Sequence, residues 1–354
     1  MQPFRRRPDA LASAAILLTA ALTASCASRS HFVRDPDGFG STGPTAPVRA
    51  AGEVFAYEKS PIATHEELLE EHGGYRVLRL SFPSVGNGEM VTVDYHQSTL
   101  PGRHPVVVVL PIWGRYVYPS NAVTRTLRKR SNGAVHVLNL LDDGFLTDWP
   151  ALETAPDEEA FTAIFTAGAE NERNTVIDIR RLVDWAETRH EIDREAIGLV
   201  GFSHSAIIAP TIAAAEPRIA ASVLIMGGAH PHRIVARCAG PRMTAVQQRA
   251  ASAFGWDRDY LERVLEPIYA AIDPANYPGD IDPASVLIFE AGRDTCIDEV
   301  ARTALWEAAG RPQRWVINTS HKRAFLTMTP FNLNWMRKRI WSFFEARLLS
   351  ERNH

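Results

Sequence analysis

An apolar segment that leads directly into a helical pattern restricts the fold of this chain more than any other feature. Residues 197–202 predict a buried strand, and the residues after Ser205 predict a helix. Between them lies Gly201-x-Ser203-x-Ser205, in which small residues flank Ser203 on both sides. Small residues let the strand and the helix approach closely, because larger side chains would clash. The junction therefore predicts a sharp turn that holds the Ser203 hydroxyl above the edge of a sheet, at a helix N-terminus.

Further apolar segments predict the sheet to which this strand belongs. Continuous runs rich in β-branched residues are expected as strands at 104–111, 134–140, 219–226, 285–290 and 314–317, with helical patterns between them that include a long one at 157–190. Such alternation implies right-handed crossovers. Residues 75–82 and 90–95 flank Gly86-Asn87-Gly88 and predict an antiparallel hairpin at the sheet edge. We therefore expect an α/β fold, a doubly wound and mostly parallel sheet with helices on both faces.

One connection is too long to be a plain loop. About 55 residues separate the strand at 219–226 from the one at 285–290, and helical patterns occur at 245–254 and 260–272. We expect residues 229–283 to form a helical cap inserted into a domain that spans 51–354.

The N-terminal segment predicts export. Three arginines at 5–7 precede an apolar run at 11–24, as in a secretory signal peptide over residues 1–26. Residues 22–26 resemble the lipobox of bacterial lipoproteins, although Thr23 stands where Leu or another branched apolar residue is usual and Leu22 lies one place early. We expect Cys26 to carry lipid, the alternative being an ordinary signal peptide cut near residue 24 or 27. We expect a location in the bacterial periplasm or outer membrane, and the resemblance to other bacterial lipoproteins implies the outer membrane, because Ala27 and not Asp follows Cys26. Residues 27–50, rich in Gly, Pro, Ser and Thr, are expected to be a flexible tether.

The composition argues against nucleic acid as a partner. The 354 residues carry a formal net charge of -3, and the arginines are scattered along the chain. We therefore expect no nucleic-acid partner, and contact with a membrane through the lipid anchor only.

Two residues late in the chain complete a pattern that begins at Ser203. A serine hydroxyl becomes nucleophilic when a base removes its proton and an acid orients that base. Asp294 follows the strand at 285–290, and His321 follows the last strand. Of the two histidines after Asp294, His354 is terminal, so His321 is the candidate base. For the acid two alternatives stay open: Asp298 could replace Asp294, and Asp294 could instead cap a helix.

From about residue 75 to 349 the sequence resembles the α/β-hydrolase superfamily, nearest to its dienelactone-hydrolase-like and bacterial esterase branches. The likeness is carried by the turn at Ser203, called the nucleophile elbow, by residues 180–201 before it and by the acid loop at 292–295. It implies that Ser203 is the nucleophile, His321 the base and then the acid, and Asp294 the residue that orients His321. It further implies a small-molecule ester substrate, an acyl-enzyme intermediate and no cofactor.

The loop at 111–114 departs from the His-Gly that is usual in the superfamily. The oxyanion donor there is the backbone N–H of Ile112 or Trp113, of which we favour Trp113, and His204 supplies the second donor. Three aromatic residues are expected near the site, where they line a substrate pocket or form the edge of the core: Tyr116, Phe145 and Trp149.

Other functions share this pattern. A thioesterase or peptidase would use the same three residues, and a catalytically silent lipoprotein of this fold would bind a partner or an envelope polymer. The presence of all three residues favours the enzyme. A haloalkane-dehalogenase-like function is disfavoured, because it needs Asp at position 203.

Two further pairs of residues attract notice. His230 and His232 flank Pro231 in the manner of a zinc-binding pair, but no third ligand lies at a useful spacing, so we expect no metal. Cys238 and Cys296 belong to loops expected at the same edge of the sheet and, in an exported protein, could form a disulfide. The alternative is two separately buried thiols.

Overall fold

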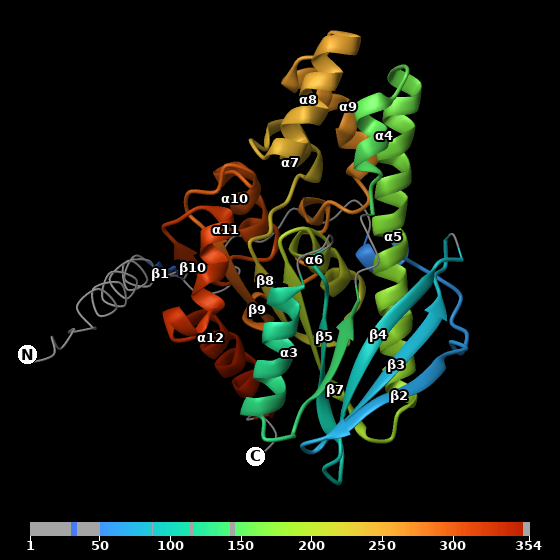
Figure 1. The fold of residues 1–354 in the computed structure, drawn as a ribbon, viewed down its shortest axis with the longest axis vertical. Coiled ribbons are helices and arrows are strands. Elements are labelled where there is room, and N and C mark those ends of the chain that lie inside the picture. Colours follow the sequence, from blue (N-terminus) through green and yellow to red (C-terminus); the bar gives the residue numbers. More distant parts are fainter. Residues whose placement is uncertain (1–29, 34–49, 87, 113–116, 142–145, 350–354) are drawn as a thin grey trace, which may run out of the picture.

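The predicted sheet is present in the computed structural model, which describes residues 30–33, 50–86, 88–112, 117–141 and 146–349. Within these residues ten strands follow one another in the order β1-β10-β9-β8-β7-β5-β6-β4-β3-β2 (Figure 1). Six neighbouring strands are parallel: β10 (Gln313–Ile317), β9 (Val286–Ala291), β8 (Ile219–Ile225), β7 (Ile192–Phe202), β5 (His104–Val109) and β6 (His136–Leu140). The prediction of a mostly parallel α/β sheet is confirmed.

One edge of the sheet is antiparallel. The predicted hairpin consists of β3 (Tyr75–Pro83) and β4 (Met90–Ser98), with Pro83 opposite Met90. Asn87 of its turn lies outside the described residues. A further strand, β2 (His65–His72), was not predicted; it pairs with β3 through Gly73 and Gly74, whose φ angles are 61° and 81°. All eight of its residues are exposed, so it lacks the alternating apolar pattern that identifies most edge strands.

At the opposite edge, four residues of the expected tether over 27–50 belong to the sheet. Ser30–Val33 form β1, which pairs antiparallel with β10. Phe32 packs on Trp315 with ring centroids 4.9 Å apart, and this contact helps to hold the strand in place. β7 is also longer than the strand predicted at 197–202, because it begins at Ile192.

Helices cover both faces of the sheet. One face carries α2 (Ala51–Val54), α5 (Glu158–Thr188), α6 (Ser205–Ala215) and α10 (Glu299–Ala308), and the other carries α3 (Tyr118–Arg130) and α12 (Trp335–Phe344). Along β7, Ile197 and Leu199 belong to the first core, whereas Val200 and Phe202 belong to the second. A strand buried on both faces needs residues without polar side chains at every position, which explains why residues 196–202 of β7 carry none.

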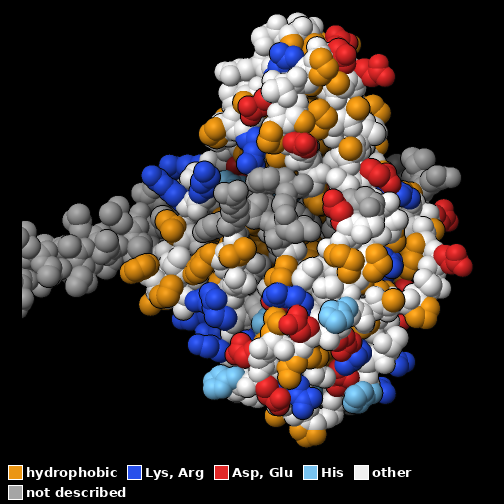
Figure 2. Space-filling view, turned by 45° about the vertical axis from the view of Figure 1, so that its right-hand side comes forward, with side chains coloured by type: hydrophobic (Ala, Val, Ile, Leu, Met, Phe, Trp, Pro, Cys, Tyr) orange, Lys and Arg blue, Asp and Glu red, His pale blue; other side chains and the backbone are white. Residues whose placement is uncertain are grey.

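The predicted cap stands at one end of the molecule. Its helices α7 (Pro231–Arg237), α8 (Pro241–Phe254) and α9 (Arg258–Tyr269) lie at the top of Figure 1 and form the upper lobe in Figure 2. The lobe also includes α4 (Trp149–Thr154), which contacts α8. The start of α5 belongs to it as well, since the ring centroid of Phe161 lies 5.4 Å from that of Phe254 and 5.8 Å from that of Trp256. Short helical segments complete the chain: η1 (Pro274–Asn276), η2 (Pro283–Ser285), α11 (His321–Ala324), η3 (Phe325–Met328), η4 (Pro330–Asn332) and η5 (Glu345–Leu349).

Charged side chains of both signs are interspersed over the face that Figure 2 shows. Among the described residues, no helix is both long enough and apolar enough to span a bilayer.

The turn between β7 and α6 has the predicted form. A Cβ atom on Gly201 would lie 2.7 Å from the carbonyl oxygen of Ser205, so only glycine allows the helix this close to the strand. Ser203 has a φ of 52°, a left-handed conformation that is strained for a residue with a side chain. Ser205 replaces the usual glycine and is fully buried; its Oγ accepts the Phe202 N–H at 2.7 Å and donates to the Phe202 carbonyl at 3.1 Å.

Ser205→Ala should therefore destabilise the protein, because the buried N–H of Phe202 loses its partner. We expect a loss of about 1–3 kcal/mol in the free energy of unfolding, measured by urea denaturation. Ser252→Ala, at an exposed position of α8, is the matched control and should change stability by less than about 0.5 kcal/mol. Equal stability of the two variants would contradict this account of Ser205.

Candidate active site

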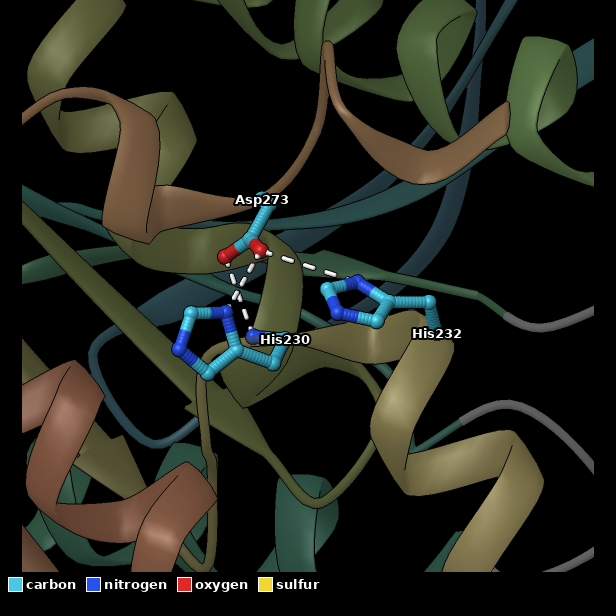
Figure 3. Close-up of side chains that lie close together, drawn as sticks. All are labelled: His230, His232 and Asp273. Atoms are coloured by element: carbon cyan, nitrogen blue, oxygen red, sulfur yellow. Dashed lines mark hydrogen bonds and ion pairs between the residues drawn. The ribbon is translucent and has the colours of Figure 1, made fainter. Parts of the chain in front are cut away.

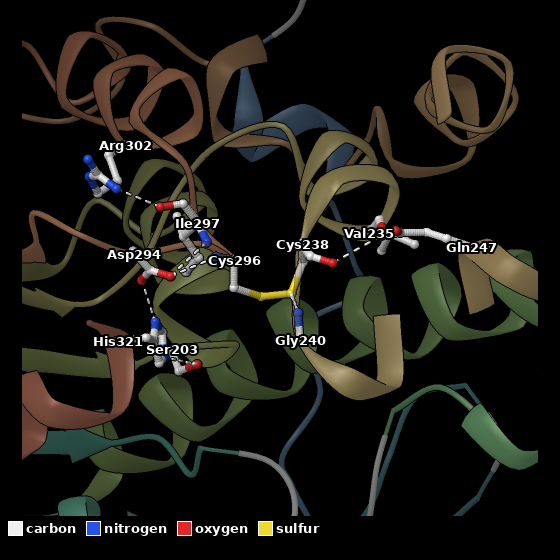
Figure 4. Close-up of a disulfide and its surroundings, with 10 residues drawn as sticks. All are labelled: Ser203, Val235, Cys238, Gly240, Gln247, Asp294, Cys296, Ile297, Arg302 and His321. Carbon is white, nitrogen blue, oxygen red and sulfur yellow. Dashed lines mark hydrogen bonds and ion pairs between the residues drawn. A yellow bond between two sulfur atoms is a disulfide. The ribbon is translucent and has the colours of Figure 1, made fainter. Parts of the chain in front are cut away.

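Three residues predicted to act together are brought into one hydrogen-bonded chain. His321 Nε2 lies 2.9 Å from Ser203 Oγ, and His321 Nδ1 lies 2.5 Å from Asp294 Oδ2 (Figure 4). Ser203 follows β7, Asp294 follows β9, and His321 follows β10 as the first residue of α11. These three strands are parallel, so their carboxyl ends meet at one edge of the sheet, where functional groups of such sheets collect.

Asp294 is held as a charged carboxylate. Its Oδ1 accepts the N–H groups of Cys296 at 2.9 Å and Ile297 at 3.1 Å. Burial raises the pKa of this carboxyl, but the hydrogen bond to His321 and those two N–H groups outweigh the effect and hold the pKa below its usual value. An ionised carboxylate only accepts hydrogen bonds, so the proton of the neutral His321 ring resides on Nδ1. Nε2 is then free to accept the hydrogen of the Ser203 hydroxyl.

Asp298, the alternative acid, is occupied elsewhere. Its carboxylate caps α10 by accepting the Ala301 N–H at 3.0 Å and pairs with Arg233 at 2.7 Å. Asp294, not Asp298, is therefore the partner of His321.

Ser203 and His321 face a cavity of about 260 Å³ beneath the cap. Its lining is mostly apolar but includes two charged side chains, Glu172 and Arg242; the remaining residues are Ile112, Trp149, Ser203, His204, Ile207, Pro231, Ile234, Val235, Met243, Tyr269, Cys296, Ile297 and His321. Trp149 thus lines the cavity as predicted, and it also packs on Phe165 of the core, with ring centroids 6.4 Å apart. Tyr116 and Phe145, the other two predicted lining residues, lie outside the described part of the chain.

The predicted oxyanion donors are only partly described. His204 lies at the N-terminus of α6, next to Ser203, where backbone N–H groups point out of the helix. Ile112 lines the cavity. Trp113, the donor favoured over Ile112 in that loop, lies outside the described residues.

Glu172 was not predicted, yet its carboxylate contacts the residue that follows Ser203. Its Oε1 lies 2.9 Å from Nε2 of His204, and the side chain is 3% exposed. The sequence does contain a signal, because Glu172 falls on the stripe of α5 that also buries Ala169 and Val176. A carboxylate on an apolar stripe needs a buried partner, so its position identifies it as a residue of interest. His204 therefore contributes a ring contact in addition to its backbone.

The predicted disulfide is present. Cys238 and Cys296 are bonded, as Figure 4 shows, across a sequence separation of 58 residues. Cys238 ends α7 of the cap, whereas the Cys296 N–H donates to Asp294. A backbone hydrogen bond of 3.0 Å from Ala239 to Thr295 reinforces this connection. The cap is thereby tied to the loop that carries Asp294, and the alternative of two separately buried thiols is wrong.

Breaking this disulfide should lower stability. In the chain-entropy model, a disulfide that closes a loop of 58 residues raises the free energy of unfolding by about 4 kcal/mol. We expect the paired variant Cys238→Ser with Cys296→Ser to unfold at a lower urea concentration than the oxidised wild type. The reductant dithiothreitol should shift the wild type toward the variant and leave the variant unchanged. A wild type that is insensitive to the reductant, with both thiols shown to be free, would contradict the expectation.

A third residue joins His230 and His232, contrary to the expectation that they lack one. Asp273 lies 43 positions after His230 in the sequence, and its Oδ2 is 3.0 Å from the Nδ1 atom of His230 (Figure 3). The sequence spacing between the histidines and Asp273 is irregular, because it depends on the length of the cap.

Comparison with known proteins identifies the fold. No protein-family model and no curated protein matches the sequence. Among solved structures, an acetyl xylan esterase from Paenibacillus sp. R4 matches with a TM-score of 0.57 and 14% identity, over 84% of this chain and 92% of that one. Acetyl xylan esterase 1 from Thermoanaerobacterium sp. JW/SL YS485 matches with a TM-score of 0.53 and 15% identity, over 85% of this chain and 96% of that one. An acylaminoacyl peptidase from Pyrococcus horikoshii matches with a TM-score of 0.52 and 12% identity, over 78% of this chain and 42% of that one. The chain therefore has the α/β-hydrolase fold, as its sequence predicted.

Proposed function

We propose that the protein is a serine hydrolase that cleaves carboxylic esters through an acyl-enzyme. The observation that carries this proposal is the hydrogen-bonded chain from Ser203 through His321 to Asp294, with Ser203 and His321 facing a cavity. Esterases and a peptidase occur among the structures of similar fold, which is consistent with the proposal but shows the fold alone.

The reaction follows from the positions of the atoms. Ser203 Oγ attacks the ester carbonyl carbon while its proton moves to His321 Nε2, and Asp294 stabilises the imidazolium that forms. The protonated Nε2 then donates to the departing alkoxide, which leaves as an alcohol, and the acyl group stays on Ser203. A water molecule, deprotonated by the same Nε2, releases the carboxylic acid and restores the serine hydroxyl.

The negative charge on the carbonyl oxygen needs donors during both steps. We assign the backbone N–H of His204, at the N-terminus of α6, as one donor and that of Trp113 as the other, with Ile112 as the alternative. The pairing of Glu172 with the His204 ring would fix the orientation of this residue.

The cavity supports a small substrate. A volume of about 260 Å³ lies below the range of about 300–1,000 Å³ that is usual for drug-sized ligands, so a short acyl group fits best. We place the chain nearest to the dienelactone-hydrolase-like and esterase branches on its sequence motifs. Thioesters and amides remain alternatives, since the same three residues would cleave them.

Replacing the three residues should separate catalysis from folding. We expect Ser203→Ala and His321→Ala to lower kcat for nitrophenyl acetate by about 10⁶-fold, and Asp294→Asn by about 10⁴-fold, because the wrong tautomer of His321 then prevails. Circular dichroism should show that all three variants are folded.

Asp298→Asn is the matched control for the acid. It should retain most of the activity, because Asp298 contacts Arg233 and α10 and not His321. A wild type without esterase, thioesterase or amidase activity would favour the silent lipoprotein, and a larger loss in Asp298→Asn than in Asp294→Asn would refute the assignment of the acid.

We further propose that the protein is exported to the bacterial periplasm or outer membrane and anchored through lipid on Cys26. The support is the sequence of residues 1–26. Wild type should partition into the detergent phase and Cys26→Ala into the aqueous phase, because a lipid chain supplies the affinity for the membrane. Equal partitioning of the two proteins would exclude the anchor.

A further inference from the structure

We propose that His230, His232 and Asp273 bind a zinc ion that joins the two ends of the cap segment. The three side chains converge at the base of the cap, and they are distinct from the three residues of the hydrogen-bonded chain that contains Ser203. They come from two parts of the sequence, the start of α7 and the segment between α9 and η1.

The donor atoms already face one another. Figure 3 shows that both Nδ1 atoms point toward Asp273, whose Oδ2 lies 3.0 Å from Nδ1 of His230 and 3.9 Å from Nδ1 of His232. One donor atom from each residue lies within 4.8 Å of the others. Zinc bonds of about 2.0–2.1 Å in a tetrahedral arrangement place donors about 3.3 Å apart, so small rotations of the side chains would complete the site.

Asp273 is oriented by the backbone. Its Oδ1 accepts the N–H of His230 at 3.0 Å and that of Ala275 at 3.0 Å, and the residue is only 3% exposed. These two bonds turn Oδ2 toward both imidazole rings. Hydrogen bonds of this kind to a ligating carboxylate are the usual support around a metal in a protein.

His232 provides the observation that points to a ligand. The residue is 9% exposed, and its Nδ1 is a buried atom with no hydrogen-bond partner in the described part of the chain. The 3.9 Å separation from Asp273 is too long for a hydrogen bond. A buried polar atom without a partner costs free energy, and a metal ion between these side chains would provide the missing interaction.

The donor set selects zinc among the common ions. Two imidazole nitrogens with one carboxylate form a usual zinc site, in which a water molecule occupies the fourth position. Calcium takes six to eight oxygen ligands, and magnesium also prefers oxygen, so neither suits this set. The side chain of His230 is 32% exposed, which leaves one side of the site accessible to that water.

The position of the site indicates what the ion would do. His230 and His232 stand where the chain enters the cap, and Asp273 stands where it leaves. An ion held by all three would close the loop that contains α7, α8 and α9. Pro231, between the histidines, and Tyr269 line the cavity beside Ser203. The ion would therefore stabilise the cap over the cavity and take no part in the reaction.

Zinc binding can be measured without an assay of activity. The full-length protein, purified without a histidine tag and dialysed against EDTA, is titrated with zinc chloride in a calorimeter. We expect one saturable equivalent, and a Co²⁺ titration should give the visible absorption of a tetrahedral site. Loss of a residue that only supports a ligand typically lowers metal affinity by roughly 10–100-fold. His232→Ala removes a ligand itself, so it should lower the zinc affinity by more than that. His65→Ala, an exposed histidine of β2, is the matched control and should bind as the wild type does.

Stability provides the second measurement. Zinc binds the folded state, so it should raise the Tm of the wild type and of His65→Ala by several degrees and leave that of His232→Ala unchanged. Circular dichroism should show that His232→Ala is folded, because the Nδ1 that it removes makes no hydrogen bond. Asp273→Asn retains an oxygen for the two backbone bonds and should also lose zinc. The absence of saturable binding by the wild type, or unchanged binding by a folded His232→Ala, would overturn the proposal.

Discussion

The close contact between α6 and β7 is the constraint on which the rest of the structure depends. The helix can lie against the strand only because Gly201 has no side chain, and a Cβ on Gly227 would also collide with α6, at 2.3 Å from the Ala206 carbonyl oxygen. This contact forces Ser203 into its left-handed conformation and turns its hydroxyl toward His321. The hydroxyl of Ser205 closes the same turn from within. Backbone strain at Ser203 is thus sustained by packing on both sides of it.

The cap is attached to this framework through helix α7. At its N-terminal end, His230 contacts Asp273, and at its C-terminal end, Cys238 is bonded to Cys296. Ion pairs of Arg233 with Asp298 and Glu262 add contacts between α7, α10 and α9. Residues of α7 that line the cavity therefore belong to a helix restrained at both ends. The shape of the cavity follows from these restraints as much as from the sheet.

The sequence predicted those parts of the fold that depend on local pattern. Buried parallel strands such as β5 and β7 are apolar at successive positions, and the turn at Ser203 has a local motif, so both could be recognised. β2 could not be recognised from its pattern, because it is an exposed edge strand with the composition of a helix, although Gly73-Gly74 offered a turn signal.

The site was predictable to the extent that its residues follow strands. Ser203, Asp294 and His321 each lie just after a parallel strand, so topology alone brings them together. Glu172 lies on a buried stripe of α5, so its burial was readable from spacing, but its partner was not. Asp273 lies at the end of the cap, and no spacing in the sequence brings it to His230 and His232. The choice between Asp294 and Asp298 was likewise settled only by side-chain geometry.

Helix α5 gives the molecule a mechanical property. Its 31 residues form a rod about 46 Å long, because each residue of an α-helix adds about 1.5 Å. The first turns of the rod belong to the cap through Phe161, its middle holds the His204 ring through Glu172, and its last turns lie along the sheet. A displacement of the lobe would be transmitted along this rod to the residue beside Ser203. The position of the lobe and the orientation of the nucleophile's turn are thus coupled through one continuous helix.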